Sequence, residues 1–135
     1  MTKAKTQGVH HVGLTVPRLE AARTFFEQAL GCRTVGEVPD YPAVFVSDGS
    51  VMLTLWQAQS PETCTPFDRK QVIGLHHLAL AIADGTTLEA LHAELSQRDD
   101  VVVEFAPESL GGSNTRHMML AIPGNIRLEL IAPSP

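Results

Sequence analysis

Apolar and polar residues alternate along several short segments of the chain, which is the pattern of a strand with one buried face. Segment 11–16 alternates in this way. Between Pro17 and Gly31 an apolar residue recurs every three or four positions, which predicts a helix over 18–30. Further alternating segments, separated by turn-forming residues, predict strands at 33–38, 43–47 and 51–58. The first half of the chain is therefore predicted to be βαβββ.

The second half repeats this order. Residues 8–16 and 74–82 share one pattern, in which glycine, an apolar residue and two histidines are followed by apolar, small, Leu, small and apolar residues. A doubled histidine in nine aligned positions is hard to obtain by chance. A leucine stripe after Asp84 predicts the second helix, and strands are predicted at 101–105, 116–122 and 126–132.

The repeat predicts the fold class and its boundaries. We expect an α+β fold of two βαβββ modules, at 8–58 and 74–133, joined by a connector at 59–73. A chain of 135 residues that is 44% hydrophobic and 19% charged suits a single domain over 1–135. Both modules are therefore expected to belong to one domain.

Charge and hydropathy exclude several classes of partner. The formal net charge is −5 and no basic run occurs, so nucleic acid is not expected as a partner. No apolar stretch approaches the roughly 20 residues that span a bilayer, and no secretory signal is expected. Cys32 and Cys64 are isolated, which is typical of free thiols. We therefore expect a cytoplasmic protein.

Side-chain alternation decides which histidine of each pair faces away from the helix. In the first strand the alternate residues from Val12 to Val16 are apolar, so His11 points to the opposite face. In the matching strand the alternate residues from Leu78 onward are apolar. This leaves His77 beside small alanines, with room in front of its imidazole for a ligand.

The last strand of each module follows the same rule. Leu128 and Leu130 are expected on the helix side, which places Glu129 on the face of His77. The matching position in the first module is Thr54, which is a poor metal ligand. Two neutral imidazoles and one carboxylate suit a divalent transition metal with open positions for water or substrate. The residues thus predict a metal centre made by the second histidine of each pair and Glu129.

At these motifs the chain resembles the vicinal oxygen chelate superfamily, which includes glyoxalase I, extradiol dioxygenases, fosfomycin resistance proteins, methylmalonyl-CoA epimerase and bleomycin-binding proteins. The resemblance rests on H-x-x-L-x-V at 11–16, F-F-x-x-x-L-G at 25–31, H-x-x-L-x-I at 77–82 and L-E-L at 128–130. It covers nearly the whole chain. These motifs are specific for the superfamily and weak for the reaction.

The resemblance implies a half-barrel cup formed by the two modules, with metal ligands from the first and last strand of each. It marks His11, His77 and Glu129 as ligands and Thr54 as the fourth position, where glyoxalase I usually has a carboxylate. It also implies a homodimer, in which modules pair either within one chain or across the two subunits.

Three functions follow as expectations. The first is a glyoxalase-like lyase or isomerase that acts on a small oxygenated substrate, with Fe, Ni, Zn, Mn or Co as Lewis acid and Glu129 moving a proton. The second is a non-haem Fe(II) dioxygenase of the extradiol type, because the same three ligands form its facial triad. The third is a non-catalytic binding or drug-resistance protein, in which His11 and His77 line the cup without a metal.

Other side chains are candidates for substrate contact. The apolar and hydroxyl candidates, which could equally be ordinary packing, are Thr54, Trp56, Met52, Phe45 and Met118. Arginine forks match carboxylates and phosphates, so an anionic group of the substrate could be held by Arg116, His117 or Arg127. For each of these three residues the alternative is a solvated surface position.

Overall fold

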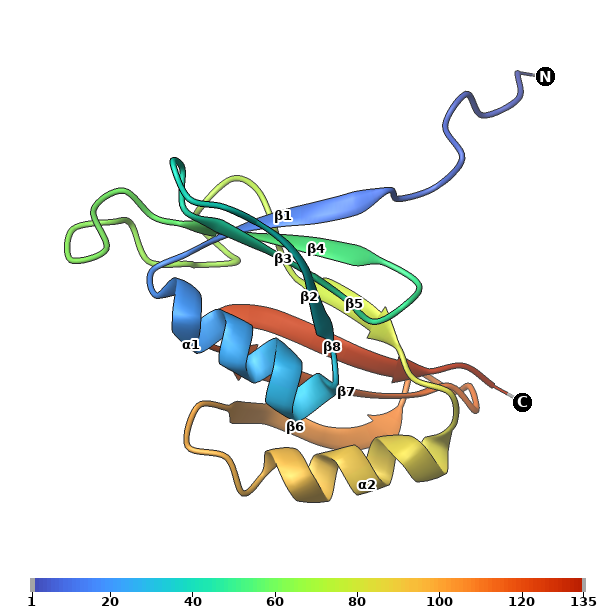
Figure 1. Ribbon diagram of the computed structural model, residues 1–135. Helices are drawn as coiled ribbons and strands as arrows, with labels where there is room; N and C mark the ends of the chain where they lie inside the picture. Colours follow the sequence, from blue (N-terminus) through green and yellow to red (C-terminus); the bar gives the residue numbers. More distant parts are fainter. Residues whose placement is uncertain (1, 135) are drawn as a thin grey trace. The chain divides into compact units, whose positions relative to one another are not determined.

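The computed structural model describes residues 2–134, and Figure 1 follows the chain from its blue amino end to its red carboxyl end. The chain divides into two compact units, Met1–Cys64 and Thr65–Pro135. The boundary between them lies inside the predicted connector at 59–73. Each unit is described by itself.

Unit 1 is a four-stranded mixed sheet with one helix. Strand β1 (His11–Val16) is parallel to β4, and the sheet order is β1-β4-β3-β2. The remaining strands are antiparallel neighbours: β2 (Arg33–Val38), β3 (Ala43–Ser47) and β4 (Met52–Gln57). Helix α1 (Leu19–Thr24) continues into a π-helical turn, η1 (Phe25–Ala29), and contacts β3 and β4.

Unit 2 repeats this topology, as the sequence predicts. Its sheet order is β5-β8-β7-β6, with β5 (Leu78–Ala81) parallel to β8 (Ile126–Ala132). Strands β6 (Val102–Ser109) and β7 (Arg116–Ile122) complete the sheet. Helix α2 (Gly85–Leu95) lies along one side of β6, β7 and β8 (Figure 1), and its first turn is capped by the Asp84 carboxylate, which accepts from the N–H of Thr87. The α+β fold of two βαβββ modules is thus confirmed.

Two helical details explain where the first helix ends. Gly31 has a φ of +73°, the left-handed conformation that glycine adopts without a steric penalty. The N–H of Cys32 donates to the carbonyl of Phe26, and the N–H of Gly31 donates to the carbonyl of Glu27. These bonds satisfy the last carbonyls of the helix, so the predicted end before Gly31 is confirmed.

Strand β6 departs most from its prediction. It runs to Ser109, four residues beyond the predicted end at residue 105. Its pairing with β7 is irregular between Val103 and Phe105 and again between Phe105 and Glu108. A bulge adds a residue to one strand and shifts its alternation. The apolar and polar residues of β6 therefore do not alternate strictly up to its last residue, and a prediction from strict alternation ends the strand too early.

One face of each sheet is covered by the helix of the same unit and holds the core. The fully buried side chains include Phe25, Phe26, Leu53 and Leu55 in unit 1, and Leu88, Leu95, Met118, Leu120, Leu128 and Leu130 in unit 2. The opposite face of each sheet is called here the helix-free face.

Both cysteines are free, and none of the described helices is long and apolar enough to cross a membrane.

Candidate metal centre

Glu129 lies on the helix-free face of unit 2, as the alternation of β8 predicts. Its neighbours Leu128 and Leu130 are completely buried on the other face, and its paired residues are Ala79 on β5 and Met119 on β7. Glu129 is nevertheless only 8% exposed. A carboxylate with so little solvent needs hydrogen-bonding or charged partners.

Two imidazoles lie against the oxygens of this carboxylate. His77, which directly precedes β5, places Nε2 at 3.2 Å from Glu129 Oε1. His117 on β7 places Nδ1 at 2.6 Å from Glu129 Oε2. Each carboxylate oxygen therefore contacts a different histidine, one on either side of β8.

The sequence predicts His117 only as an anion contact, whereas in the structure it bonds to Glu129. It is 9% exposed, and the ring of Phe105 lies against it with a centroid distance of 5.0 Å. Its Nε2 lies 3.9 Å from Glu108 Oε1, on the exposed side. Because His117 alternates with the apolar Met118 along its strand, the sequence could have indicated that His117 lies on the face of Glu129. Only the register of β7 and β8 shows that the two side chains meet.

We expect His117→Ala to destabilise the protein by about 1–3 kcal/mol, because it leaves the buried Oε2 of Glu129 without its donor. Urea unfolding monitored by circular dichroism measures the change. The matched control is His92→Ala, which removes a histidine from the last turn of α2. Equal midpoints for the two variants would contradict a structural role for the His117–Glu129 bond.

The doubled histidines adopt the same arrangement in both units. Nδ1 of His10 lies 2.9 Å from Nδ1 of His11, and Nδ1 of His76 lies 2.8 Å from Nδ1 of His77. The rings are T-shaped in each pair. Two such nitrogens can bond only if one carries the proton. If Nδ1 of the second histidine carries the proton, its Nε2 keeps a free lone pair. This tautomer is the one that binds a metal through Nε2.

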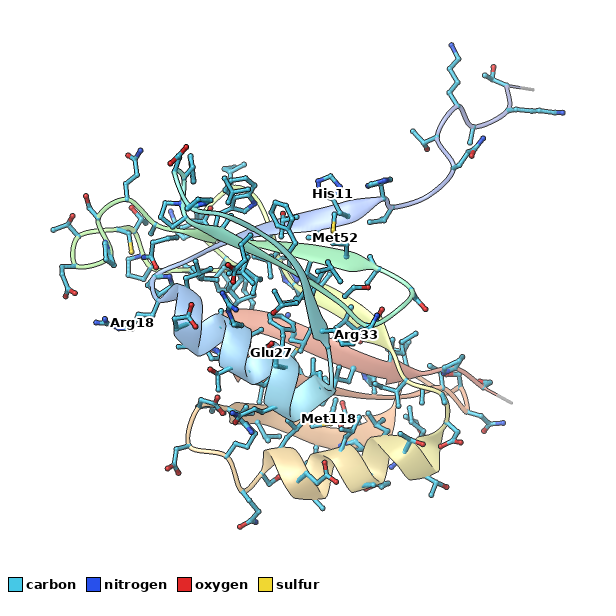
Figure 2. The ribbon with its side chains drawn as sticks, in the orientation of Figure 1. His11, Arg18, Glu27, Arg33, Met52 and Met118 are labelled. Carbon is cyan, nitrogen blue, oxygen red and sulfur yellow. The ribbon has the colours of Figure 1, made fainter. Side chains whose placement is uncertain are left out.

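In unit 1, His11 begins β1 on the helix-free face, opposite Met52 of β4; both are labelled in Figure 2. Thr54, the fourth position, is 4% exposed, and its hydroxyl accepts from Trp56 Nε1 at 2.9 Å. A Cβ on Gly13 would lie 3.0 Å from the same hydroxyl. The Thr54 hydroxyl is thus engaged within unit 1. The meeting of His11 with His77 and Glu129 stays a prediction.

The predicted apolar contacts of unit 1 lie beside Thr54. Phe45 pairs with Thr54 across β3 and β4, and its ring is 6.1 Å from that of Trp56. Tyr41, which was not among the predicted contacts, packs edge-on against Trp56 at 4.9 Å. Together with Met52, these side chains form an aromatic and thioether surface on the helix-free face of unit 1.

Two of the predicted substrate contacts of unit 2 lie on the helix-covered face. Met118 is completely buried opposite Leu130. Arg116 Nη2 donates to Glu89 of α2 at 2.8 Å and to the carbonyl of Pro107 at 3.2 Å. Because side chains alternate along β7, both residues lie on the side opposite His117 and Glu129. Neither residue therefore shares a face with the proposed ligands of unit 2.

Arg127 lies on the helix-free face, two residues from Glu129. Its Nε and Nη2 donate to the two oxygens of Glu104 at 2.9 and 2.6 Å, and Arg69 Nη1 donates to Glu104 Oε1 at 2.8 Å. These guanidinium groups, Arg127 first, lower the pKa of Glu104 from 4.5 to about 2.

The depressed pKa of Glu104 predicts a loss of stability in acid. A carboxylate with a lower pKa in the folded state stabilises the fold above its unfolded pKa, and the contribution disappears as the pH falls from 4.5 toward about 2. Since Glu104 is partly exposed, we expect only about 1 kcal/mol or less. Urea unfolding of wild type and Glu104→Gln should differ at pH 7 and converge by about pH 2. A constant difference would contradict the assignment.

The donor set can be tested against the geometry of a shared metal ion. Ligands at about 2.1 Å from one ion are about 3.0 to 3.4 Å apart at octahedral or tetrahedral angles. The 3.2 Å between His77 Nε2 and Glu129 Oε1 falls in this range. Among residues 2–134, no group of three His, Cys, Asp or Glu side chains is gathered closely enough to hold a metal ion. Unit 2 thus holds two candidate donors, His77 and Glu129, at the spacing that ligands of one ion would have.

Solved structures with this fold come from several bacteria. A glyoxylase/bleomycin resistance protein/dioxygenase domain from Frankia sp. EAN1pec has a TM-score of 0.81 at 22% identity, with 96% of this chain and 94% of that chain covered. Lactoylglutathione lyase from Agrobacterium tumefaciens has a TM-score of 0.72 at 16% identity, with 96% of each chain covered. A protein of Bacillus halodurans that has been proposed to be a glyoxalase has a TM-score of 0.75 at 26% identity, with 94% and 97% covered.

The sequence itself matches a family model over most of its length. No curated protein matches the chain significantly. The model of the Glyoxalase/Bleomycin resistance protein/Dioxygenase superfamily matches residues 8–130, which include both doubled histidines and Glu129. The chain therefore belongs to the glyoxalase/bleomycin resistance protein/dioxygenase superfamily.

Proposed function

We propose that the protein is a metal-dependent enzyme that acts on a small oxygenated substrate as a glyoxalase-like lyase or isomerase. Its metal ligands are His11, His77 and Glu129. The observation that carries the proposal is the pair His77 Nε2 and Glu129 Oε1, which lie 3.2 Å apart on the helix-free face. The repeated position of His11 in unit 1 supports it as the third ligand.

A divalent ion bound there supplies Lewis-acid polarisation of a substrate carbonyl or hydroxyl. The protein side chains perform the rest. His117 holds Oε2 of Glu129 and so directs Oε1 toward His77. Glu129 is also the group that takes and returns a substrate proton. Met52, Phe45 and Trp56, with the Thr54 hydroxyl held by Trp56, contact the substrate from unit 1.

One observation favours a second candidate, a non-haem Fe(II) dioxygenase of the extradiol type. The Thr54 hydroxyl is engaged by Trp56 and offers no carboxylate, so the proposed ligand set of His11, His77 and Glu129 is two imidazoles and one carboxylate. This is the facial triad of Fe(II) oxygenases. Oxygen uptake separates the two reactions, since a lyase or isomerase consumes none.

Elemental analysis of protein purified without a metal-binding tag tests the proposal. We expect about one Fe, Ni, Zn, Mn or Co per site in wild type and in His92→Ala, and strong depletion in His77→Ala. Fe with oxygen uptake on a catechol would favour the dioxygenase. Metal-free wild type, with small-molecule binding that His77→Ala does not change, would replace both enzymes with a non-catalytic binding or drug-resistance protein.

The superfamily also supports the proposal that the protein is a homodimer. Such a dimer would pair its modules either within a chain or between chains, and this choice would decide whether His11 and His77 of one metal centre belong to the same subunit. Light scattering at micromolar concentration measures the assembly. A monomer would contradict the homodimer and would require both modules of one chain to form the site.

A further inference from the structure

Unit 2 contains a hollow whose lining includes none of the proposed metal ligands. It has a volume of about 640 Å³ and is formed where the segment 65–72 lies against Glu104, Ala121, Asn125 and Arg127. This size is within the range of small-molecule sites, roughly 300–1,000 Å³. Its apolar lining is supplied by Pro66, Phe67, Val72 and Ala121.

The charged side chains of the hollow carry an excess of one positive charge. Arg69, Lys70 and Arg127 line it together with Asp68 and Glu104. The formal charge of the whole chain is −5, so this local excess is opposite in sign to the protein as a whole. A cavity with low-dielectric walls concentrates such a field.

Both carboxylates of the hollow are already engaged. Glu104 accepts from Arg127 through both oxygens and from Arg69 through Oε1. Asp68 Oδ1 accepts from the backbone N–H of Lys70. The low pKa of Glu104, about 2, agrees with a positive local potential.

Cationic donors remain available beside these pairs. Arg69 contacts Glu104 through Nη1 alone, and its side chain is 29% exposed. Among residues 2–134, the ammonium of Lys70 has no ion pair. The side chain of Arg127, in contrast, is 14% exposed, and its Nε and Nη2 both donate hydrogen bonds to Glu104. The free donors of the hollow therefore come from Arg69 and Lys70, while Arg127 holds Glu104 in place.

We propose that this hollow binds a small organic monoanion, with its carboxylate on Arg69 and Lys70 and its apolar part against Phe67 and Val72. One excess positive charge matches a carboxylate better than a phosphate dianion. A guanidinium fork also matches the planar carboxylate.

Because Arg127 lines the hollow and lies two residues from Glu129, we assign this anion to the substrate. Arg127 and Glu129 point to the same face of β8, and two residues along a strand span roughly 6.6 Å. This last step rests on the proposed function, because it takes Glu129 as a metal ligand. A substrate that reaches both sites carries its carboxylate several bonds from the oxygen that the metal polarises. Binding to the hollow itself requires no metal.

Butyrate and its neutral isostere butyramide are the probes, titrated into metal-free protein and followed by ¹H–¹⁵N NMR. We expect saturable butyrate shifts confined to 65–72 and the start of β8, with a Kd on the order of 1 mM. Binding of butyramide should be weaker by at least about 10-fold. The variant Arg69→Gln/Lys70→Gln keeps the Arg127–Glu104 pair and should weaken butyrate binding by at least about fivefold. Arg98→Gln, which removes an arginine paired with Asp100, is the matched control and should bind butyrate as wild type does.

Four outcomes would overturn the proposal: no saturable butyrate shifts, equal binding of butyramide, unchanged binding in the double variant, or tighter binding of inorganic phosphate, which would assign the hollow to phosphate groups. Because these titrations contain no metal, their failure leaves the metal centre untouched. Conversely, a metal-free wild type would refute the proposed enzyme but not binding of the monoanion. Matching circular dichroism spectra and thermal midpoints check that the double variant is folded.

Discussion

Glu129→Ala is expected to lose stoichiometric metal while keeping the fold. Glu129 supplies the carboxylate of the proposed donor set, and its Oε1 lies 3.2 Å from His77 Nε2. Without it the remaining protein ligands are neutral imidazoles, which do not offset the charge of a divalent ion. Removing only a residue that orients a metal ligand lowers metal affinity by about 10–100-fold, so removing the ligand itself should lower it by at least about 100-fold. Elemental analysis and calorimetric titration with the native metal measure the change.

The control for this variant is Glu89→Ala. Glu89 is a carboxylate of the same unit that pairs with Arg116 on the helix-covered face. We expect its removal to leave metal content unchanged. Glu129→Gln, which keeps the shape of the side chain without its charge, should bind metal nearly as poorly as Glu129→Ala. Full metal occupancy in both Glu129 variants would refute the proposed ligand set.

Leu128→Ala is expected to lower the free energy of unfolding by about 2–5 kcal/mol. Leu128 is completely buried, and it points from β8 into the core beneath α2. Removing its branched end loses burial energy and leaves a cavity that the packed core fills only partly. The shift in the urea midpoint at an unchanged slope gives the value.

Leu110→Ala is the matched control for the core substitution. Leu110 follows β6 and is 43% exposed, so the same truncation removes little buried surface. We expect its free energy of unfolding to stay within about 0.5 kcal/mol of wild type. Similar losses in the two variants would contradict the placement of Leu128 in the buried core.

The sequence was sufficient for the arrangement of elements in each unit because the relevant signals are local. Apolar alternation has a period of two residues in a strand, so the faces of β1, β5 and β8 followed from neighbouring residues alone. The same rule placed Glu129 opposite Leu128 and Leu130. The left-handed Gly31 and the Asp84 cap are likewise set by residues within a few positions of the helix ends.

Contacts between distant strands needed the tertiary structure. His117 and Glu129 meet because β7 and β8 pair in a register that aligns Met119 with Glu129, which leaves His117 diagonally across. The irregular pairing in β6 brings Phe105 and Glu108 toward His117. Neither register nor bulge can be read from the alternation of one strand.

The chain itself thus determined two repeated modules and, by alternation, the candidate ligands His77 and Glu129 on one face of a sheet. Only the tertiary structure decided that His117 holds Glu129, that Trp56 engages the Thr54 hydroxyl, and that Arg116 pairs with Glu89 of α2. The physical reason is that side-chain direction is set by adjacent residues, whereas side-chain partners are set by strand pairing across many residues.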